Sequence, residues 1–240
     1  MCTLEKRGNN FLLTLIGDDE HRLNPNLIGE IRSALSQVRA QAKRGSVLIG
    51  QGKFFSNGFD LAWAESAGSG SSGFLHRLQH MGDGLKAIMV DLLSLPMPTI
   101  AAVSGHAAAA GFMLALSHDY VLMRKDRGVL YMSELDIGLT LPDYFIALLR
   151  EKIQSPMVRR DVVLHAAKVK AEEAIKMGII DSAHDSAAET LEAALRMGEK
   201  LALTARKWDG GVYAEIRKSS FPELCRVLEL QSKTIVTPRL

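Results

Sequence analysis

The sequence predicts an α/β protein whose strands lie in the first part of the chain and whose last part is helical. Short apolar runs alternate with amphipathic stretches as far as Met132, and only amphipathic stretches follow. Hydrophobic residues make up 47% of the 240 residues, which is enough for one large core. No linker or repeat divides the sequence. We therefore expect a single domain over 1–240, with a core over 1–185 and a helical region over 186–240.

The strands are predicted from apolar, β-rich runs that end at turn residues. The first run, Phe11–Ile16, stops at the turn sequence Gly17-Asp18-Asp19. A fully apolar run over 46–50 is the second strand. The remaining predicted strands cover 99–103, 120–123 and 129–132.

The helices are predicted from apolar residues three and four positions apart and from their end signals. Asn24 is expected to cap the first helix, with Pro25 at its first position. A flexible Gly/Ser loop over 66–73 is expected to precede a long helix over 74–95 that ends before Pro96. Further helical patterns cover 155–178, 187–205 and the last 30 residues.

Composition excludes several classes of protein. A formal net charge of +2, without basic stretches interleaved with aromatic residues, argues against nucleic acid as a partner. Cys2 and Cys225 are too few for a disulfide framework or a cysteine metal site, so we expect no metal. The first ten residues lack an apolar leader, and no apolar run approaches the roughly 20 residues that span a bilayer.

Two strand–loop–helix corners point to the binding of a negative charge. In the first, the strand over 46–50 leads into Asn57 and Gly58, and Asp60 lies where a helix would start. In the second, the strand over 99–103 leads into four successive alanines before Gly111. Each segment taken singly is better explained by ordinary structure, a turn in the first and tight helix–sheet packing in the second. Two such corners, however, can each supply one backbone N–H to the same oxygen.

Both corners resemble the signature of the crotonase (enoyl-CoA hydratase/isomerase) superfamily. The family pattern Phe-x-x-Gly-x-Asp-Leu is matched by residues 55–61, and Gly-x-Ala-x-Gly-Gly-Gly is matched by 105–111 with alanine at two glycine positions. Alanine fits those positions where φ is negative. The resemblance implies a repeated ββα spiral with a helical C-terminal trimerisation region. It implies an oxyanion hole made by the N–H groups of Phe59 and Ala110.

The same resemblance implies an acyl-coenzyme A substrate, with coenzyme A as part of the substrate and no separate cofactor. The substrate-binding residues that it implies follow the two motifs and the loop near Glu134; they are Asn57, Gly58, Phe59, Asp60, Leu61, Ala110 and Ser133. The basic residues that could contact the nucleotide phosphates are Lys53, Arg77, Arg206, Lys207, Arg217 and Lys218, although each taken singly is better explained as a solvated charge.

Glu134 is the predicted acid/base. It follows an apolar run, so partial desolvation should raise its pKa toward the working range of a proton shuttle. Asp136 would share its side if the segment is extended, and Asp143 is the lesser candidate for the base. In the family's hydratases a first glutamate stands at the position of Met113. One glutamate and an oxyanion hole imply a Δ3,Δ2-enoyl-CoA isomerase; the alternatives are a hydratase, a dienoyl-CoA isomerase or a non-catalytic binding protein.

Two expectations concern the whole molecule. The family resemblance implies a homotrimer or a hexamer. The terminal tripeptide Pro238-Arg239-Leu240 resembles the peroxisomal address whose standard form is Ser-Lys-Leu. We therefore expect the protein to be located in the peroxisome, with the peroxisomal import receptor as a partner. If the tripeptide does not act as an address, the protein is expected in the cytoplasm.

Overall fold

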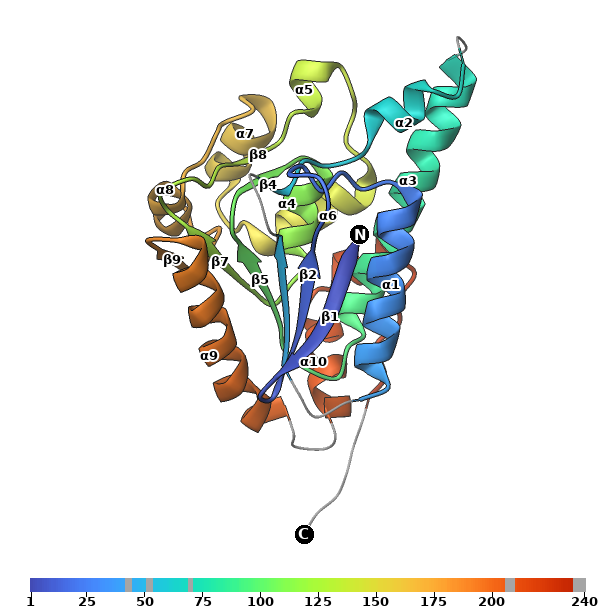
Figure 1. The fold of residues 1–240 in the computed structure, drawn as a ribbon. Coiled ribbons are helices and arrows are strands. Elements are labelled where there is room, and N and C mark those ends of the chain that lie inside the picture. Colours follow the sequence, from blue (N-terminus) through green and yellow to red (C-terminus); the bar gives the residue numbers. More distant parts are fainter. Residues whose placement is uncertain (42–44, 51–53, 69–70, 206–209, 235–240) are drawn as a thin grey trace.

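A twisted sheet with helices on both faces forms the body of the protein, as the computed structural model in Figure 1 shows. The structure describes residues 1–41, 45–50, 54–68, 71–205 and 210–234. Within this part of the chain, six strands form the main sheet in the order β1-β2-β3-β5-β7-β9. They are β1 (Cys2–Arg7), β2 (Asn10–Leu15), β3 (Gly45–Gly50), β5 (Thr99–Val103), β7 (Tyr120–Arg124) and β9 (Ser182–His184).

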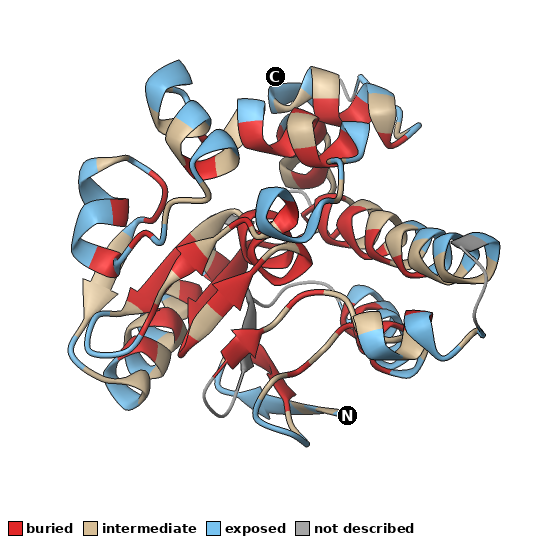
Figure 2. Ribbon diagram, turned by 90° about the horizontal axis from the view of Figure 1, so that it is seen from above, coloured by how far each residue is buried: buried red, intermediate tan, exposed pale blue. Residues whose placement is uncertain are grey.

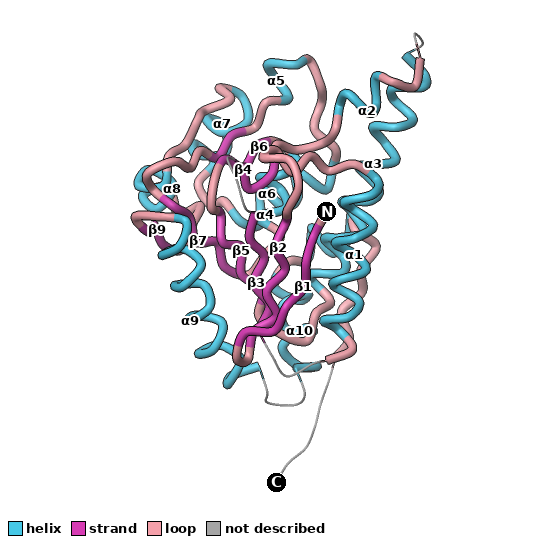
Figure 3. The backbone as a smooth tube through the Cα atoms, in the orientation of Figure 1, coloured by secondary structure: helices cyan, strands magenta, loops and turns pink. Residues whose placement is uncertain are grey.

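Only the β1–β2 hairpin is antiparallel among the strand pairs that are described; the other pairs of the main sheet are parallel. A smaller parallel sheet contains β4 (Phe54–Ser56), β6 (His106–Ala108) and β8 (Leu130–Tyr131), and Figure 3 shows it above the main sheet. Each successive pair, β3/β4, β5/β6 and β7/β8, gives one strand to each sheet before the chain enters a helix. The repeated ββα fold implied by the sequence is thus confirmed.

The helices lie on both faces of the main sheet because both faces are apolar. Along β2, Leu12 faces α9, whereas Phe11 and Leu13 belong to the larger core on the side of α1, α3 and α4. Figure 2 shows the resulting buried centre. The helices are α1 (Pro25–Arg39), α2 (Leu61–Glu65), α3 (Ser71–Leu93), α4 (Ala110–Leu116), α5 (Glu134–Ile137), α6 (Asp143–Lys152), α7 (Pro156–Leu164), α8 (Ala171–Lys176), α9 (Ala187–Ala205), α10 (Gly211–Ser220) and α11 (Pro222–Val227).

Most predicted elements are confirmed, with two corrections. The helical pattern predicted over 155–178 is two helices, α7 and α8, separated by the non-helical residues 165–170, and the Gly/Ser loop is shorter than predicted. Asn24 caps α1 by accepting from the N–H of Leu27, with Pro25 at the helix start. The predicted loop over 66–73 is too long, because α3 already begins at Ser71. Serine disfavours the interior of a helix because its side chain competes for backbone hydrogen bonds, but it is tolerated at a helix start. The serine-rich composition therefore wrongly suggested a loop up to residue 73.

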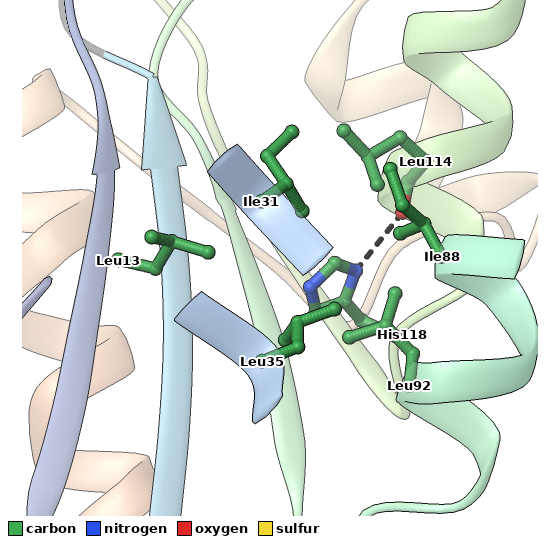
Figure 4. A pocket seen from close by; sticks show the side chains of 7 residues that line it. All are labelled: Leu13, Ile31, Leu35, Ile88, Leu92, Leu114 and His118. Carbon is green, nitrogen blue, oxygen red and sulfur yellow. Dashed lines mark hydrogen bonds between the residues drawn. The ribbon is translucent and has the colours of Figure 1, made fainter. Parts of the chain in front are cut away.

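His118 lies on the inner side of the sheet, where it serves packing. It is buried beside an apolar cavity of about 10 Å³ lined by residues from β2, α1, α3 and α4 (Figure 4). Its Nδ1 lies 2.9 Å from the carbonyl oxygen of Leu114. Burial lowers the pKa of His118 to about 4, so the ring is neutral at physiological pH.

Arg217 on α10 ties the C-terminal helices to the end of α3. Its Nε lies 2.7 Å from Oδ1 of Asp119, and its Nη1 donates to the carbonyl oxygens of Leu92 (2.8 Å) and Leu95 (2.9 Å). The side chain is 4% exposed. Arg217 is therefore a buried structural residue rather than a contact for nucleotide phosphates. Lys53, Arg206 and Lys207 lie outside the described residues.

Candidate active site

The two predicted corners meet at one edge of the small sheet. Strands β4 and β6 are parallel neighbours, so their C-terminal ends lie together and the segments that follow them are adjacent. A methyl group built on Gly58 would lie 3.1 Å from the carbonyl oxygen of Ala108, 3.2 Å from Cβ of Ala109 and 3.4 Å from the nitrogen of Ala110. The corner at Gly58 and the corner at Ala110 are thus in contact.

At the first corner, the N–H of Phe59 points away from Leu23, the residue with which Phe59 is paired. Leu23 and Phe59 form a parallel bridge in which the N–H of Leu23 donates to the carbonyl of Gly58 (2.7 Å), and the N–H of Asp60 donates to the carbonyl of Leu23 (3.3 Å). In a parallel bridge the middle residue directs its own N–H to the opposite side. Gly58 has φ +77°, which makes this turn possible.

The second corner places Ala110 at the first position of α4. The first N–H groups of a helix have no acceptor within it, so the N–H of Ala110 is available to a ligand. A methyl group on Gly111 would lie only 2.2 Å from the carbonyl oxygen of Ser56, so glycine allows α4 to rest on β4. The condition of negative φ, under which alanine replaces glycine without strain, is not met at Ala109, which has φ 49° and ψ −122°.

Glu134 lies at the first position of α5 and is 9% exposed. Among the described residues its Oε2 has no hydrogen-bond partner. Burial raises the pKa of Glu134 above its ordinary value of 4.5, and the backbone N–H groups of Glu134 and Ser133 act in the opposite direction. A carboxylate with one unpaired oxygen and a raised pKa is suited to accepting a proton from a neighbouring molecule.

A cavity of about 510 Å³ brings Glu134 and Phe59 together. Its wall comes from α3, from the segment between α5 and α6, and from the start of α6. Tyr144 closes part of this wall by donating from its hydroxyl to the carbonyl of Gly82 (3.1 Å). The described residues that line the cavity are Phe59, Leu75, Leu78, Gln79, Gly82, Asp83, Glu134, Leu139, Thr140, Leu141, Pro142 and Tyr144.

The other predicted site residues fall around this cavity without lining it. Asp60 caps α2, where its Oδ1 accepts from the N–H of Trp63 (3.0 Å), and Leu61 is the first residue of that helix. Asn57 precedes Gly58 and donates its N–H to the carbonyl of Glu20 (2.8 Å). Ser133 is the N-cap residue of α5, and its carbonyl accepts from the N–H of Ile137 (3.1 Å).

The two alternative acidic residues, and the residue at the position of the first hydratase glutamate, are less suited than Glu134 to proton transfer. Asp143 is exposed, and its Oδ1 accepts from the N–H of Tyr144 (2.7 Å). Asp136 is also exposed, and the segment is helical rather than extended, so Asp136 and Glu134 do not share a side. Met113 is fully buried in α4.

Sequence reasoning missed the wall supplied by α3. Residues Leu75, Leu78 and Gly82 are spaced three and four apart, so they lie along one face of the helix. Met81, Leu85 and Ile88 form the buried core face of the same helix. Two apolar faces on one long helix are the signal that could have revealed this wall.

The described part of the chain has neither a metal-binding cluster nor a membrane-spanning helix. No group of three or more His, Cys, Asp or Glu side chains there is arranged to hold a metal ion. The helices described there include none that is both long enough and apolar enough to cross a membrane.

Plant proteins named as isomerases are similar to this chain over all or nearly all of its length. The chain is 58% identical to the Arabidopsis thaliana protein "Enoyl-CoA delta isomerase 2, peroxisomal" over 243 residues, covering 100% of both chains. It is 56% identical to "Enoyl-CoA delta isomerase 1, peroxisomal" of the same plant over 227 residues, covering 93% of this chain and 91% of that protein.

Solved structures show the same fold at lower sequence identity. The enoyl-CoA isomerase of Mycobacterium tuberculosis in its apo form has a TM-score of 0.83 at 19% identity, covering 95% of this chain and 94% of that one. The enoyl-CoA hydratase/isomerase family matches residues 18–236. With its two corner motifs joined at one edge of the small sheet, the chain belongs to the enoyl-CoA hydratase/isomerase family.

Proposed function

We propose that this protein is a Δ3,Δ2-enoyl-CoA isomerase that converts 3-enoyl-CoA to trans-2-enoyl-CoA in fatty-acid β-oxidation. The observation that carries the proposal is the shared cavity of Glu134, whose Oε2 is unpartnered among the described residues, and Phe59, whose corner touches that of Ala110. The delta isomerases of Arabidopsis thaliana that match this chain at 56–58% identity support the same reaction.

The reaction needs one group that both removes and returns a proton. The carboxylate of Glu134 takes a proton from the α-carbon of the 3-enoyl thioester, and the electron pair moves onto the thioester oxygen as a dienolate. The N–H groups of Phe59 and Ala110 stabilise that oxygen. The protonated Glu134 then gives the proton to the γ-carbon, which restores the carboxylate and leaves the 2-enoyl thioester.

The cavity suits an apolar acyl chain. Leu78, Leu139 and Leu141 supply aliphatic surface, and Glu134 stands in the same wall. Apolar surroundings favour the neutral carboxyl group and so raise its proton affinity. Coenzyme A enters as part of the substrate, and the scheme requires neither a metal nor a separate cofactor.

Hydration is the rival reaction, and it needs a second carboxylate to activate water. Met113 at the family's first glutamate position has a thioether, which cannot accept a proton from water. Among the described residues that line the cavity, Asp83 is the other carboxylate, and it is exposed. The described lining of the cavity therefore offers no second buried carboxylate beside Glu134.

Incubation with 3-hexenoyl-CoA tests the proposal directly. We expect the absorbance of a conjugated 2-enoyl thioester to appear with multiple turnovers. In a parallel reaction with 2-hexenoyl-CoA, a hydratase would instead remove that absorbance. Hydration without formation of the 2-enoyl product from 3-hexenoyl-CoA would contradict the proposal and favour the rival.

We also propose that the protein works in the peroxisome. Two of the similar plant proteins are named peroxisomal, and the tripeptide Pro238-Arg239-Leu240 resembles an import address, although it lies outside the described residues. A fluorescent protein joined to the N-terminus should give punctate signal that coincides with a peroxisomal marker. Adding a tag after Leu240 should make the signal diffuse, because the import receptor reads a free end. Diffuse signal from both fusions would contradict peroxisomal import.

A further inference from the structure

We propose that Ala109 is a positioning residue for the oxyanion hole, and that its methyl group sets the spacing between the two N–H donors. This inference rests on the proposed function, because it assigns a role within the same hole. Ala109 does not itself touch the reacting atoms. It acts through Ala110, the next residue, and through Gly58, the residue before Phe59.

The backbone of Ala109 adopts a conformation that glycine normally occupies. Its φ of 49° and ψ of −122° lie outside the regions that alanine favours. Two hydrogen bonds hold it there: its N–H donates to the carbonyl of Tyr131 (2.9 Å), and its carbonyl accepts from the N–H of Met113 (3.0 Å). The first bond links the corner to β8 and the second links it to α4. The surrounding elements therefore impose the conformation on Ala109.

Both donors follow a residue with positive φ. Gly58, with φ +77°, precedes Phe59, and Ala109, with φ 49°, precedes Ala110. Such a residue turns the next peptide group, so its N–H no longer follows the direction of the preceding strand. The same local device thus occurs at both corners, once with glycine and once with alanine.

The methyl group of Ala109 lies at the contact between the corners. A methyl group built on Gly58 would be 3.2 Å from Cβ of Ala109 and 3.4 Å from the nitrogen of Ala110. The methyl group of Ala109 and the nitrogen of Ala110, the second proposed donor, therefore both lie close to Gly58. Gly58 itself has no side chain, so the methyl group of Ala109 fills space beside Gly58 that would otherwise lie open between the two corners.

Glycine at position 109 would relieve the strain but remove this contact. The Gly58 and Ala110 corners would then gain freedom to shift relative to each other. Placement of catalytic groups is sensitive to small shifts, and a displacement of about 1 Å can cost a factor of about 100 in rate. We therefore expect Ala109→Gly to fold more stably and to catalyse more slowly.

Ala166 offers a matched control. It is another alanine with positive φ, 46°, and it lies in the loop after α7, outside the lining of the cavity. Ala109→Gly and Ala166→Gly make the same chemical change, and each removes a methyl group from a residue with positive φ. They differ in whether the alanine adjoins the proposed hole.

The experiment compares wild type, Ala109→Gly and Ala166→Gly for kcat and KM with 3-hexenoyl-CoA, for thermal unfolding, and for hydrogen exchange. Each substitution should raise the unfolding midpoint by about 2–4 °C. Ala109→Gly should lower kcat about tenfold with KM changed less than twofold, and amide exchange over residues 107–113 should be faster. Ala166→Gly should leave kcat, KM and exchange over 107–113 unchanged.

Several results would overturn the role of Ala109. One is an Ala109→Gly variant that keeps kcat within twofold of wild type. Another is a fall in kcat accompanied by a lower unfolding midpoint, which would indicate general loss of structure. An equal loss of kcat in Ala166→Gly would also overturn it. Failure of the proposed function looks different, because wild type itself would then form no 2-enoyl product.

Discussion

Glu134 is only 9% exposed, and burial favours the neutral form of its carboxyl group. The folded protein therefore binds a proton at Glu134 more strongly than the unfolded chain does. By linkage, the stability that comes from this proton is present below the ordinary pKa of 4.5 and is lost as the pH rises through the raised pKa. Above the raised pKa, the ionised Glu134 thus weakens the folded state.

The substitution Glu134→Gln should consequently stabilise the protein at neutral pH. Gln keeps the shape of the side chain and removes the cost of burying a charge. Thermal unfolding of wild type and Glu134→Gln from pH 4 to pH 8 checks this prediction. The midpoint of the variant should exceed that of wild type at pH 8, and the two should converge toward pH 4. Equal midpoints across the whole range would show that Glu134 is not desolvated in the folded protein.

Individual residues were predicted from the sequence where their neighbours in the chain determine the environment. The apolar run before Glu134 predicted its burial, and Asn24 and Asp60 were predicted as helix caps. Ala109 was not predictable in this way. Its positive φ comes from hydrogen bonds to Tyr131 and Met113, and the bond to Tyr131 is made by a distant part of the chain.

At the scale of elements, α4 depends on its close approach to β4. The position of a Cβ on Gly111 would be 2.2 Å from the carbonyl oxygen and 2.8 Å from the carbonyl carbon of Ser56. Both atoms belong to backbone within a sheet, so they cannot move away without cost. We expect Gly111→Ala to lower the free energy of unfolding by about 1–3 kcal/mol.

Chemical denaturation of Gly111→Ala measures this loss, with Gly29→Ala as the control. A Cβ on Gly29 meets nothing within 4 Å, and Gly29 lies within α1, where alanine favours the helix. Gly29→Ala should therefore keep or raise the stability. If Gly111→Ala proved as stable as wild type, the close contact between α4 and β4 would be contradicted.

Long elements were predicted well and very short ones were missed. The helix over 74–95 is long enough to show a helical period, and the strand over 99–103 is long enough to show a continuous apolar run. Strands β4 and β6 have three residues each, too few for a pattern to emerge. Because these strands bring the two corners together, the sequence indicated both halves of the proposed oxyanion hole without the sheet that joins them.

At the scale of the whole molecule, several apolar side chains on the outer helices are exposed. Met157 is 66% exposed, Leu164 62%, Leu203 62% and Ile216 61%. Large apolar side chains on several helices favour contact with another copy of the chain. We therefore predict self-association, with a homotrimer as the expected species.

Sedimentation or light scattering at micromolar concentration measures this assembly. The mass should exceed that of the 26.2 kDa chain and correspond to a trimer or a multiple of it. A single species of 26.2 kDa under those conditions would contradict the prediction. The trimer was inferred from family resemblance, because exposure of Ile216 or Leu203 becomes evident only once the helices are folded.

The whole fold was predictable because a few motif residues identify the family. Alternation of strands and helices indicated an α/β protein, whereas the motifs at 55–61 and 105–111 indicated the ββα spiral. The edge strands β1 and β9 were missed. β1 is largely exposed and carries charged residues, and β9 has three residues, so neither has the apolar character of a central strand.

The most direct test of the central claim is the rate of 3-hexenoyl-CoA isomerisation by Glu134→Gln. Gln cannot accept and return the proton, so we expect kcat to fall by a factor of roughly 10² to 10⁴ or more. Binding of saturated hexanoyl-CoA, measured by calorimetry, should remain near that of wild type, since the proposed N–H donors are unchanged. Asp143→Asn and Asp83→Asn, which remove the neighbouring exposed carboxylates, should keep most of the wild-type rate. If Glu134→Gln retained more than half of that rate while Asp143→Asn or Asp83→Asn lost it, the assignment of Glu134 as the base would be contradicted.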